Sequence, residues 1–456
     1  MTDFAAALRQ RVVSLAERHG VPGVAAGVDV GGATTFACHG ITHADHPLPI
    51  DPDTLFQIAS NSKPFTATLV MQLVEEGAIG LDDPVRRHLP DFRMPDRRYD
   101  DAVTIRHLLS HRVGWDGDAI FVRQPHPPSL DNSFDCMASA RQLVPPGGLW
   151  TYSNAGFSIA GRLVEVLREA PFDRVLRQRI LDPLGMQHTC TRADDAIFHR
   201  VAMRHLSRAG SKPMPLPSGG WQAGWELASI DTPAGGVISS AADLLRWLRF
   251  WLGRHDPGRT PPLTSETRAR MCEDQLPPWN STAGQAIGWA VRLDPAARVL
   301  SHGGLTAGYC SFTLFVPTLD LAMVVLTNGT SGGLVHMDLT RWVVGEVGGR
   351  PWVDPVALEQ QPPLARYAGA YWGSFGITRV SEVDGELEIV TERHSTDDGS
   401  WQPPPEPPAR ARLCSPAVAV AHQPDYLRGV LIDFDDSEDP PAWLRVGGRI
   451  SVRVES

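Results

Sequence analysis

The order of apolar and polar positions along the chain predicts an α/β body followed by an all-β tail. Residues 4–19 place apolar side chains at helical spacing and end at Gly20, which predicts an amphipathic helix. Two strands, 21–30 and 33–39, follow and are joined at a glycine pair. Helical periodicity returns in 64–76, 103–110, 154–168, 172–181, 241–252 and 334–347, and strand-like runs close this part at 310–316 and 321–327. Strands at both ends with helices between them predict a sheet that joins the two ends of the segment.

A change of composition marks the end of this body. Residues 351–363 contain many prolines and glutamines and are typical of a linker. Beyond them, short strands are predicted at Tyr371 and in 377–383, 386–390, 417–421, 427–433, 443–446 and 450–454. Short, evenly spaced strands predict a small barrel, and the proline-rich stretch 402–408 predicts a loop. We therefore expect a body at 1–350, a linker at 351–363 and a β-barrel domain at 364–456.

The composition of the 456-residue chain excludes several classes of protein. With 42% hydrophobic residues it is globular, and a net charge of -10 argues against nucleic acid or an anionic membrane as the main partner. Apolar runs stay below the ~20 residues that a membrane span needs, and the N-terminus lacks the apolar core of a secretory signal. The six cysteines are scattered without a C-x-x-C pair, which favours reduced thiols and a cytoplasmic location. We expect neither a metal nor another cofactor.

Lys63 is the most informative residue of the sequence. Of 42 lysines and arginines only two, Lys63 and Lys212, are lysines. Lys63 closes the unit Ser60-Asn61-Ser62-Lys63 at the start of a predicted helix, which places it on the same helix face as Ser60. Arginine stays protonated in proteins, whereas a buried lysine can lose its proton near neutral pH and activate a hydroxyl nucleophile. The competing interpretation of this tetrapeptide is a capping serine beside a solvated lysine.

Two later segments complete a known pattern. Tyr152-Ser153-Asn154 lies near the middle of the body, and His302-Gly303-Gly304-Leu305 precedes its closing strands. The order S-x-x-K, Y-x-N, H-x-G resembles the serine β-lactamase and penicillin-binding-protein superfamily, in particular its class-C-like branch with D-aminopeptidases and esterases. The resemblance covers about residues 5–350, with further similarity in 56–59, 104–111, 183–186 and 234–237. It implies a β-lactamase/transpeptidase-like α/β fold, with an antiparallel sheet flanked by helices and a helical subdomain.

The resemblance also assigns roles to the motif residues. Ser60 is the nucleophile, and the dipole of its helix favours the negative charge that develops there. Lys63 or Tyr152 accepts the serine proton, and the sequence leaves that division open. Asn154 hydrogen-bonds Lys63 and a substrate amide. By family analogy, the backbone N–H groups of Ser60 and Leu305 form the oxyanion hole.

The third motif departs from the usual family pattern. His302 stands where relatives that bind a free substrate carboxylate usually have lysine. Histidine is neutral for much of the time at pH 7, so His302 would bind a carboxylate less firmly and can relay protons with Tyr152. This favours esters, thioesters or amides over antibiotics as substrates. Gly303 and Gly304 beside it would let a substrate approach the strand edge closely.

Other residues are candidates for substrate contact. We assign Trp115 to the substrate, and in the tail we expect Arg445 or Arg449 to reach the pocket. The alternatives are core packing for the tryptophan and ordinary solvated strand positions for the arginines. The tryptophans considered for aromatic subsites are Trp115, Trp150, Trp221, Trp225 and Trp289.

Two short polar patterns stay ambiguous in the sequence. Asp116-Gly117-Asp118 can line the mouth of a cleft and attract a cationic substrate, or it can form a solvated turn. His107 and His111 stand four residues apart, but the glutamate of an H-E-x-x-H zinc motif is missing. Helix packing is therefore favoured over zinc for the two histidines.

A barrel tail that resembles a lipocalin-like domain narrows the resemblance to penicillin-binding-protein-type thioesterases, which cyclise nonribosomal peptides in trans. Such an enzyme takes a peptidyl thioester, or a carrier-protein-bound peptide, that ends in a D-residue. It forms an acyl-serine and releases a head-to-tail macrocycle. The alternative is a D-stereospecific peptidase or esterase that uses water. A non-catalytic binding protein is a different class, against which the intact Ser60, Lys63, Tyr152 and His302 argue.

Overall fold

The structure is a computed structural model that describes residues 2–118, 130, 140–216, 225, 227, 229–275, 283–293, 297–393, 407–424 and 427–454. Contacts group these residues into two compact units, each discontinuous in sequence. Unit 1 comprises the described residues of 2–83, 130 and 157–352. Unit 2 comprises those of 84–118, 140–156 and 353–454. The sequence predicts domains that are continuous in the chain, with boundaries at 350 and 364. Unit 2 instead combines residues from 353 onward with two earlier segments, 84–118 and 140–156.

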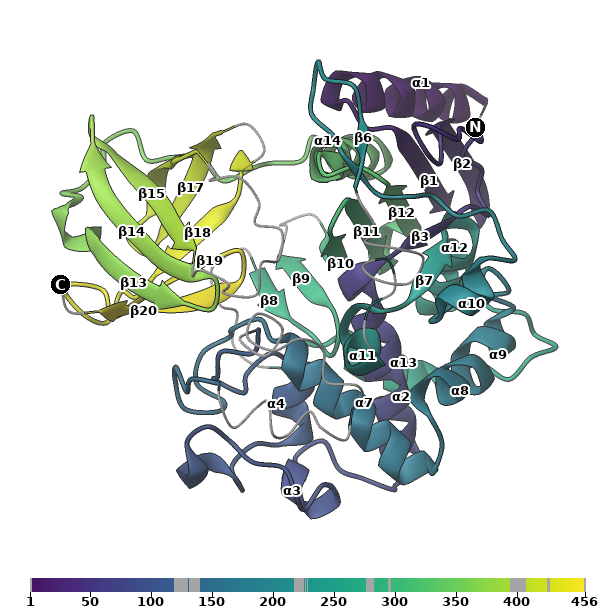
Figure 1. Cartoon of the computed structure of the whole chain (residues 1–456), viewed down its shortest axis with the longest axis horizontal. Helices are drawn as coiled ribbons and strands as arrows, with labels where there is room; N and C mark the ends of the chain where they lie inside the picture. Colours follow the sequence, from purple (N-terminus) through teal and green to yellow (C-terminus); the bar gives the residue numbers. More distant parts are fainter. Residues whose placement is uncertain are drawn as a thin grey trace. The chain divides into compact units, whose positions relative to one another are not determined.

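Unit 1 is built on an antiparallel sheet whose strands are β1 (Gly23–Val30), β2 (Ala33–Gly40), β8 (Ala283–Gln285), β9 (Ala290–Leu293), β10 (Arg298–Thr306), β11 (Tyr309–Val316) and β12 (Leu321–Thr327). Among the described residues their order is β2-β1-β12-β11-β10-β9-β8 (Figure 1). The first and last strands predicted for this body, β1 and β12, pair within the sheet, with Ala26 opposite Val325. Of β10, only Arg298–Ser301 pairs with β9, whereas the rest, including His302, pairs with β11 alone within the described chain. This arrangement leaves one edge of the H-x-G motif without a strand partner.

Helices cover both faces of this sheet. α1 (Thr2–His19) and α14 (Gly332–Gly348) pack on one face, in a cluster that includes Leu8, Leu314 and Leu339. α12 (Ala241–Trp251) packs on the other face, where the rings of Trp251 and Phe315 lie 5.7 Å apart. Leu314 and Phe315 face different layers because successive residues of a strand point to opposite sides.

The helix that begins at Lys63 is buried on every side. α2 (Lys63–Glu75) follows the 3-10 turn η1 (Ala59–Ser62), and residues 63–73 are all buried. A helix of this kind lies inside a core. The remaining elements of unit 1 are α7 (Asn154–Arg168, from Phe157 onward), α8 (Phe172–Leu176), the π-helical η4 (Arg177–Leu181), α9 (Asp182–Leu184), α10 (Ala193–Ala196), η5 (Ser229–Asp231), α11 (Thr232–Gly235), α13 (Ser265–Cys272), η6 (Pro317–Leu319), β3 (Leu55–Gln57), β4 (Thr189–Cys190), β5 (His205–Leu206), β6 (Met214–Pro215) and β7 (Ile238–Ser240).

Unit 2 contains a closed antiparallel barrel. Its core is apolar and includes Tyr371, Leu387, Leu413 and Leu444. Closure leaves the sheet without a free edge. The strands, in barrel order, are β13 (Gly369–Gly373), β14 (Gly376–Val383), β15 (Glu386–Arg393), β16 (Ala409–Ser415), β17 (Val418–Gln423), β18 (Leu431–Phe434), β19 (Trp443–Val446) and β20 (Arg449–Val454), and the short helix η7 (Ala365–Tyr367) precedes them.

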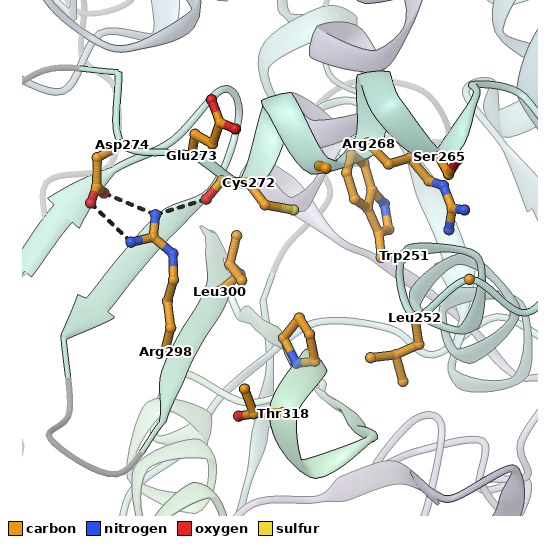
Figure 2. A pocket seen from close by; sticks show the side chains of 13 residues that line it. Trp251, Leu252, Ser265, Arg268, Cys272, Glu273, Asp274, Arg298, Leu300 and Thr318 are labelled. Atoms are coloured by element: carbon orange, nitrogen blue, oxygen red, sulfur yellow. Dashed lines mark hydrogen bonds and ion pairs between the residues drawn. The ribbon is translucent and has the colours of Figure 1, made fainter.

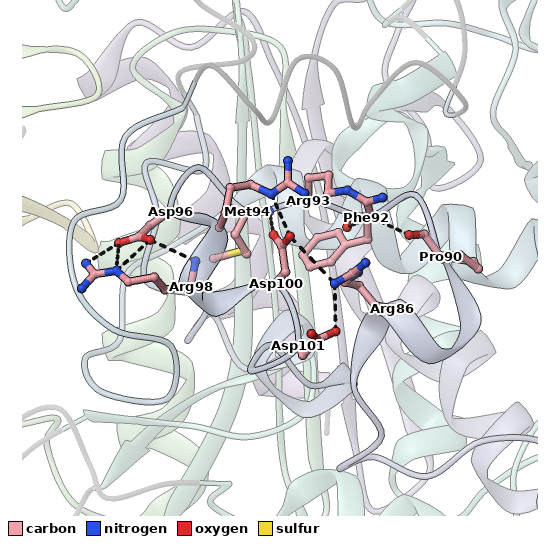
Figure 3. A network of polar contacts seen from close by, with 10 residues as sticks. Arg86, Pro90, Phe92, Arg93, Met94, Asp96, Arg98, Asp100 and Asp101 are labelled. Carbon is pink, nitrogen blue, oxygen red and sulfur yellow. Dashed lines mark hydrogen bonds and ion pairs between the residues drawn. The ribbon is translucent and has the colours of Figure 1, made fainter.

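The segment of unit 2 before residue 118 holds α3 (Val85–His88), η2 (Arg97–Tyr99) and α4 (Ile105–Leu109). A polar network orders its loop (Figure 3). The buried carboxylate of Asp100 accepts hydrogen bonds from the Met94 backbone N–H and from Arg97 Nε, both at 2.7 Å. The neighbouring pair of Arg98 and Asp96 is exposed, and pairs of that kind add little stability.

The predicted fold class is confirmed, including the small all-β barrel at the end of the chain. Most predicted helices and strands are present within a few residues of their expected bounds. β16 was not predicted because its sequence, Ala409 to Ser415, alternates alanine and arginine without large β-formers, yet its small side chains face the barrel core. α13 was missed because it is polar and buries only Met271 fully. Within the described helices, none is long and apolar enough to cross a membrane.

Candidate active site

Ser60 and Lys63, the predicted nucleophile and its predicted base, lie side by side in unit 1. Lys63 has no exposed surface, and its Nζ lies 3.0 Å from Ser60 Oγ and 2.6 Å from the carbonyl oxygen of Ala234, to which it donates. Ser60 is half-buried in η1, the 3-10 turn that leads into the buried helix α2. The preceding Ala59 has φ +49°, a left-handed conformation that costs a non-glycine residue free energy. The competing interpretation of a solvated lysine is therefore wrong, because Lys63 is enclosed beside the hydroxyl.

Strand β11 fixes the turn that carries Ser60. Asn61 Nδ2 donates to Ser311 Oγ at 2.7 Å, and Ser311 Oγ donates to the carbonyl oxygen of Ile58 at 2.6 Å. Thr313 Oγ1 donates to Asn61 Oδ1 at 2.5 Å. All these atoms are buried, so each bond replaces water and is costly to lose. The turn that carries Ser60, the predicted nucleophile, is thus attached to the sheet on both sides of this residue.

Gly304 lets β10 approach that turn. A Cβ atom on Gly304 would lie 2.2 Å from the Ile58 carbonyl oxygen and 2.3 Å from Ser311 Oγ, which no real side chain tolerates. A Cβ on Gly303 would only make ordinary contact, at 3.7 Å, with the Phe312 ring. Leu305, next along the strand, is 72% exposed. The structure therefore gives Gly304 a packing role against the protein itself, and leaves Gly303 and Leu305 at the open edge of β10.

His302 is buried and uncharged at neutral pH. Burial, together with the neighbouring Lys63, lowers the pKa of His302 to about 3. Its Nδ1 lies 2.8 Å from the carbonyl oxygen of Gly303, so Nδ1 carries the proton in this contact and Nε2 is left as an acceptor. A neutral imidazole cannot bind a carboxylate by charge, as expected from its replacement of lysine.

Asp231 is a candidate that the sequence analysis missed. Burial raises the pKa of Asp231 to about 7, and a protonated Lys63 opposes this rise. Its Oδ1 is buried without a hydrogen-bond partner in the described structure. Three residues later, Ala234 supplies the carbonyl that binds Lys63. A lone aspartate before the run Thr232 to Gly235 carries no sequence signal of this proximity, since the fold alone brings it near Lys63.

Tyr152 and Asn154 lie in unit 2, in contact with the barrel. The ring of Tyr152 stacks on His111, with centroids 4.4 Å apart, and the guanidinium of Arg449 lies 4.8 Å from the Tyr152 centroid. Asn154 Nδ2 donates to Asp118 Oδ1 at 2.5 Å, and Arg449 Nε donates to Asp118 Oδ2. Arg449 thus reaches the Y-x-N motif of its own unit. The placement of Tyr152 and Asn154 at Ser60 stays a prediction from the sequence.

Two residues that the sequence analysis assigned to substrate have internal partners. Trp115 is fully buried and donates from Nε1 to Ser153 Oγ at 2.9 Å. It therefore supports the Y-x-N motif from the protein interior. Arg445 is 2% exposed, and it binds Asp433 and the carbonyl oxygen of Trp150. Their free surface is too small for the substrate contact expected of them. Trp150, Trp225 and Trp289 are also buried, and Trp221 lies outside the described residues.

The two ambiguous polar patterns have structural partners. Asp116 and Asp118 are buried, and Asp116 accepts a hydrogen bond from Ser374 of the barrel, so they do not form a solvated turn. His107 belongs to a capping box with Thr104. His111 lies beyond the helix and accepts the Ser153 backbone N–H at Nδ1, 3.1 Å away. Its stacking on Tyr152 is a contact that the spacing of the histidines could not predict.

A separate cavity of about 750 Å³ lies in unit 1 and is lined by α12, α13, η6 and the start of β10 (Figure 2). Its charged walls have partners within the protein. Arg298 forms hydrogen bonds with Asp274 at 2.9 and 3.0 Å, and Arg268 donates to the Phe250 carbonyl near the end of α12. None of the motif residues lines this cavity, so it is distinct from the Ser60–Lys63 centre.

The fold and the Ser60–Lys63 centre define a serine hydrolase of the β-lactamase and penicillin-binding-protein type, class-C-like. The chain belongs to the Beta-lactamase family, whose sequence profile matches residues 8–345. Penicillin-binding protein 4 of Amycolatopsis lactamdurans is 34% identical over 375 residues, 80% of this chain and 96% of that protein. Members of the family are serine hydrolases.

Solved structures share the whole architecture. The crystal structure of SurE has a TM-score of 0.75 at 23% identity and covers 99% of both chains, and a second structure of SurE holds D-Leu. The octameric penicillin-binding protein homologue from Pyrococcus abyssi has a TM-score of 0.64 at 20% identity and covers 98% of this chain and 99% of that one. At these identities the likeness establishes the fold, barrel included.

We expect Gly304→Ala to destabilise the protein, because its Cβ would collide with Ile58 and Ser311. Overpacking of this kind costs about 1–3 kcal/mol. Gly303→Ala is the matched control, since the same atom one residue earlier meets only the Phe312 ring at an ordinary distance. Urea unfolding measures both free energies, and equal midpoints for the two variants would contradict the proposed close approach.

We expect the free energy of unfolding of the His302→Gln variant to depend less on pH than that of the wild type. The unfolded chain binds a proton at this histidine near pH 6.5, whereas the folded protein does so only near pH 3. The contribution of His302 to the free energy of unfolding is therefore complete above pH 6.5 and is lost as the pH falls towards 3. Between pH 7.5 and 5.5 the wild type should lose about 1.4 kcal/mol more unfolding free energy than the variant. An identical loss in both proteins would show that His302 takes up its proton at the same pH in the folded protein as in the unfolded chain.

Proposed function

We propose that this enzyme forms an acyl-Ser60 intermediate from a peptidyl ester or thioester with a D-configured C-terminal residue, and releases the peptide as a head-to-tail macrocycle. The observation that supports this proposal most strongly is the enclosed Lys63 amine, which lies 3.0 Å from Ser60 Oγ. In its neutral form this amine donates one N–H to the Ala234 carbonyl and keeps its lone pair for the serine hydroxyl. That is the arrangement of a general base beside its nucleophile.

The first half of the reaction acylates the enzyme. The Ser60 hydroxyl proton passes to Lys63, or to Tyr152 in the role that the family resemblance gives it, while Oγ bonds to the substrate carbonyl carbon. The backbone N–H groups of Ser60 and Leu305 receive the oxyanion. The carbon–sulfur bond then breaks, and the leaving thiol takes up the proton. A carrier-protein-bound peptide and a small thioester both fit this step.

The second half decides between cyclisation and hydrolysis. In cyclisation, the N-terminal amine of the peptide attacks the acyl carbon, the Ser60 ester bond breaks, and the amine proton returns to Ser60. Exposed Leu305 on the open edge of β10 offers an apolar contact for the acyl chain. The D-Leu bound to SurE, a protein of the same fold, supports a D-configured residue. Neutral His302 supports an ester or thioester over a substrate with a free carboxylate.

A D-stereospecific peptidase or esterase is the second candidate function. It would use the same Ser60 and Lys63 but pass the acyl group to water. The half-exposed position of Ser60 favours access of water to the acyl-enzyme. The two functions differ in the acyl acceptor alone, so product analysis separates them.

We expect a linear peptidyl thioester mimic with a C-terminal D-residue to give mainly the macrocycle, since a cyclase must keep water from the acyl-enzyme and admit an amine. Its L-epimer should react at least ~10-fold more slowly, which corresponds to about 1.4 kcal/mol in the barrier. Mass spectrometry distinguishes the two products, because the linear acid contains one water molecule more than the ring. Mainly linear acid from the D-substrate would favour the peptidase or esterase.

Variants of Ser60 and Lys63 test the roles of these two residues in acylation. Ser60→Ala should give no acyl adduct in intact-mass spectra. Lys63→Arg should be nearly as inactive as Lys63→Ala, because arginine stays protonated. Lys212→Arg is the matched control, an exposed lysine that should behave as wild type. A normal adduct on the Ser60→Ala protein would exclude this serine as the nucleophile.

A further inference from the structure

The barrel holds the Y-x-N segment through its own backbone. The Tyr152 N–H donates to the Gly448 carbonyl oxygen at 2.8 Å, and the Ile450 N–H donates to Thr151 Oγ1 at 3.2 Å. Gly448, in the turn between β19 and β20, has φ +82°, and a Cβ there would lie 2.7 Å from the Trp150 ring. The turn therefore fits directly against Trp150, Thr151 and the backbone of Tyr152.

A single carboxylate joins the barrel to both motif side chains. Asp118 is 2% exposed, and its two oxygens are divided between different partners. Oδ1 accepts from Asn154 Nδ2 at 2.5 Å, and Oδ2 accepts from Arg449 Nε. A buried carboxylate needs such partners, since removing one leaves a charge out of water without compensation.

The carboxylate determines which way the Asn154 amide points. Ionised aspartate only accepts hydrogen bonds, so it selects the rotamer in which the NH₂ group of Asn154 faces Asp118. The carbonyl oxygen of Asn154 is then directed away as an acceptor. An acceptor is what a protonated amine or a substrate amide N–H requires.

Arg449 links the same carboxylate to Tyr152. Its guanidinium lies 4.8 Å from the centroid of Tyr152 and 5.1 Å from that of Phe375. Burial opposes its charge, but Asp118, Tyr152 and Asp116 outweigh burial and raise the pKa of Arg449. Arg449 is thus a permanent, planar cation against the tyrosine ring, with His111 also stacked on that ring.

We propose that Asp118 is a positioning residue of the reaction, which orients Asn154 directly and Tyr152 through Arg449, and that the barrel is by this route a part of the catalytic apparatus. The proposal rests on the proposed function, in which Tyr152 and Asn154 act at Ser60. It predicts that the barrel matters for every substrate, including small ones that cannot reach a distant recognition surface.

The test is Asp118→Asn, assayed with a small activated ester. Asparagine keeps the shape but lets Asn154 flip, so we expect kcat to fall about 10- to 100-fold with KM within about threefold, the split that marks loss of an interaction in the transition state. Arg449→Lys keeps the charge but loses the planar contact with Tyr152, and should give a smaller fall in kcat. Arg379→Ala, which removes an exposed barrel arginine paired with Glu392, is the control and should match wild type.

A double-mutant cycle separates positioning from general destabilisation. If Asp118 acts through Asn154, then Asp118→Asn should cost less than about threefold in kcat in the Asn154→Ala background, where no amide is left to orient. If Asp118→Asn lowered kcat in that background by the same factor as in the wild type, the proposal would be overturned. Wild-type kcat in both Asp118→Asn and Arg449→Lys would also overturn it. Failure of the proposed function has a different signature, since wild type itself would then show no Ser60-dependent acylation.

Discussion

The enclosure of the Lys63 amine is the constraint on which the rest of this protein depends. An ammonium group without exposed surface is costly unless it is paired, and loss of its proton avoids that cost. The hydrogen bond to the Ala234 carbonyl positions Nζ, and the buried α2 positions the backbone, so that the amine lies 3.0 Å from the Ser60 hydroxyl. The scarcity of lysine elsewhere in the chain fits a position where arginine cannot replace it.

The sheet and the barrel then serve as rigid supports for short polar segments. In unit 1, β11 holds the serine turn through Asn61, and Gly304 allows β10 to approach the Ile58 carbonyl. In unit 2, the β19–β20 turn holds Tyr152 by its backbone. Sites built on strands and helices keep their geometry better than sites on free loops. Both units thus use backbone contacts at glycines, where no side chain intervenes, to position groups that carry chemistry.

Local motifs could be predicted from the sequence, and long-range supports could not. Ser60 and Lys63 could be predicted because they stand three residues apart in one S-x-x-K unit, and the sheet because apolar runs mark β1 and β12. Asp118 and Arg449 are separated by 331 residues, so their contact has no local signal. Trp115 and Arg445 were assigned to substrate from residue type alone, although burial commits both to the interior. Asp231 was missed because no local sequence pattern indicates that the fold brings it close to Lys63.

The protonation state of Lys63 can be measured directly, because the chain contains only two lysines. In protein labelled only at lysine with ¹³C and ¹⁵N, the spectrum contains two sets of side-chain signals, one from Lys63 and one from Lys212. Lys212→Arg assigns them. If Lys63 is the general base, it gives at pH 8 the chemical shifts of a neutral amine, distinct from those of exposed Lys212. The chemical shifts of an ammonium at Lys63 at that pH would contradict this role, because a protonated amine cannot accept the Ser60 proton.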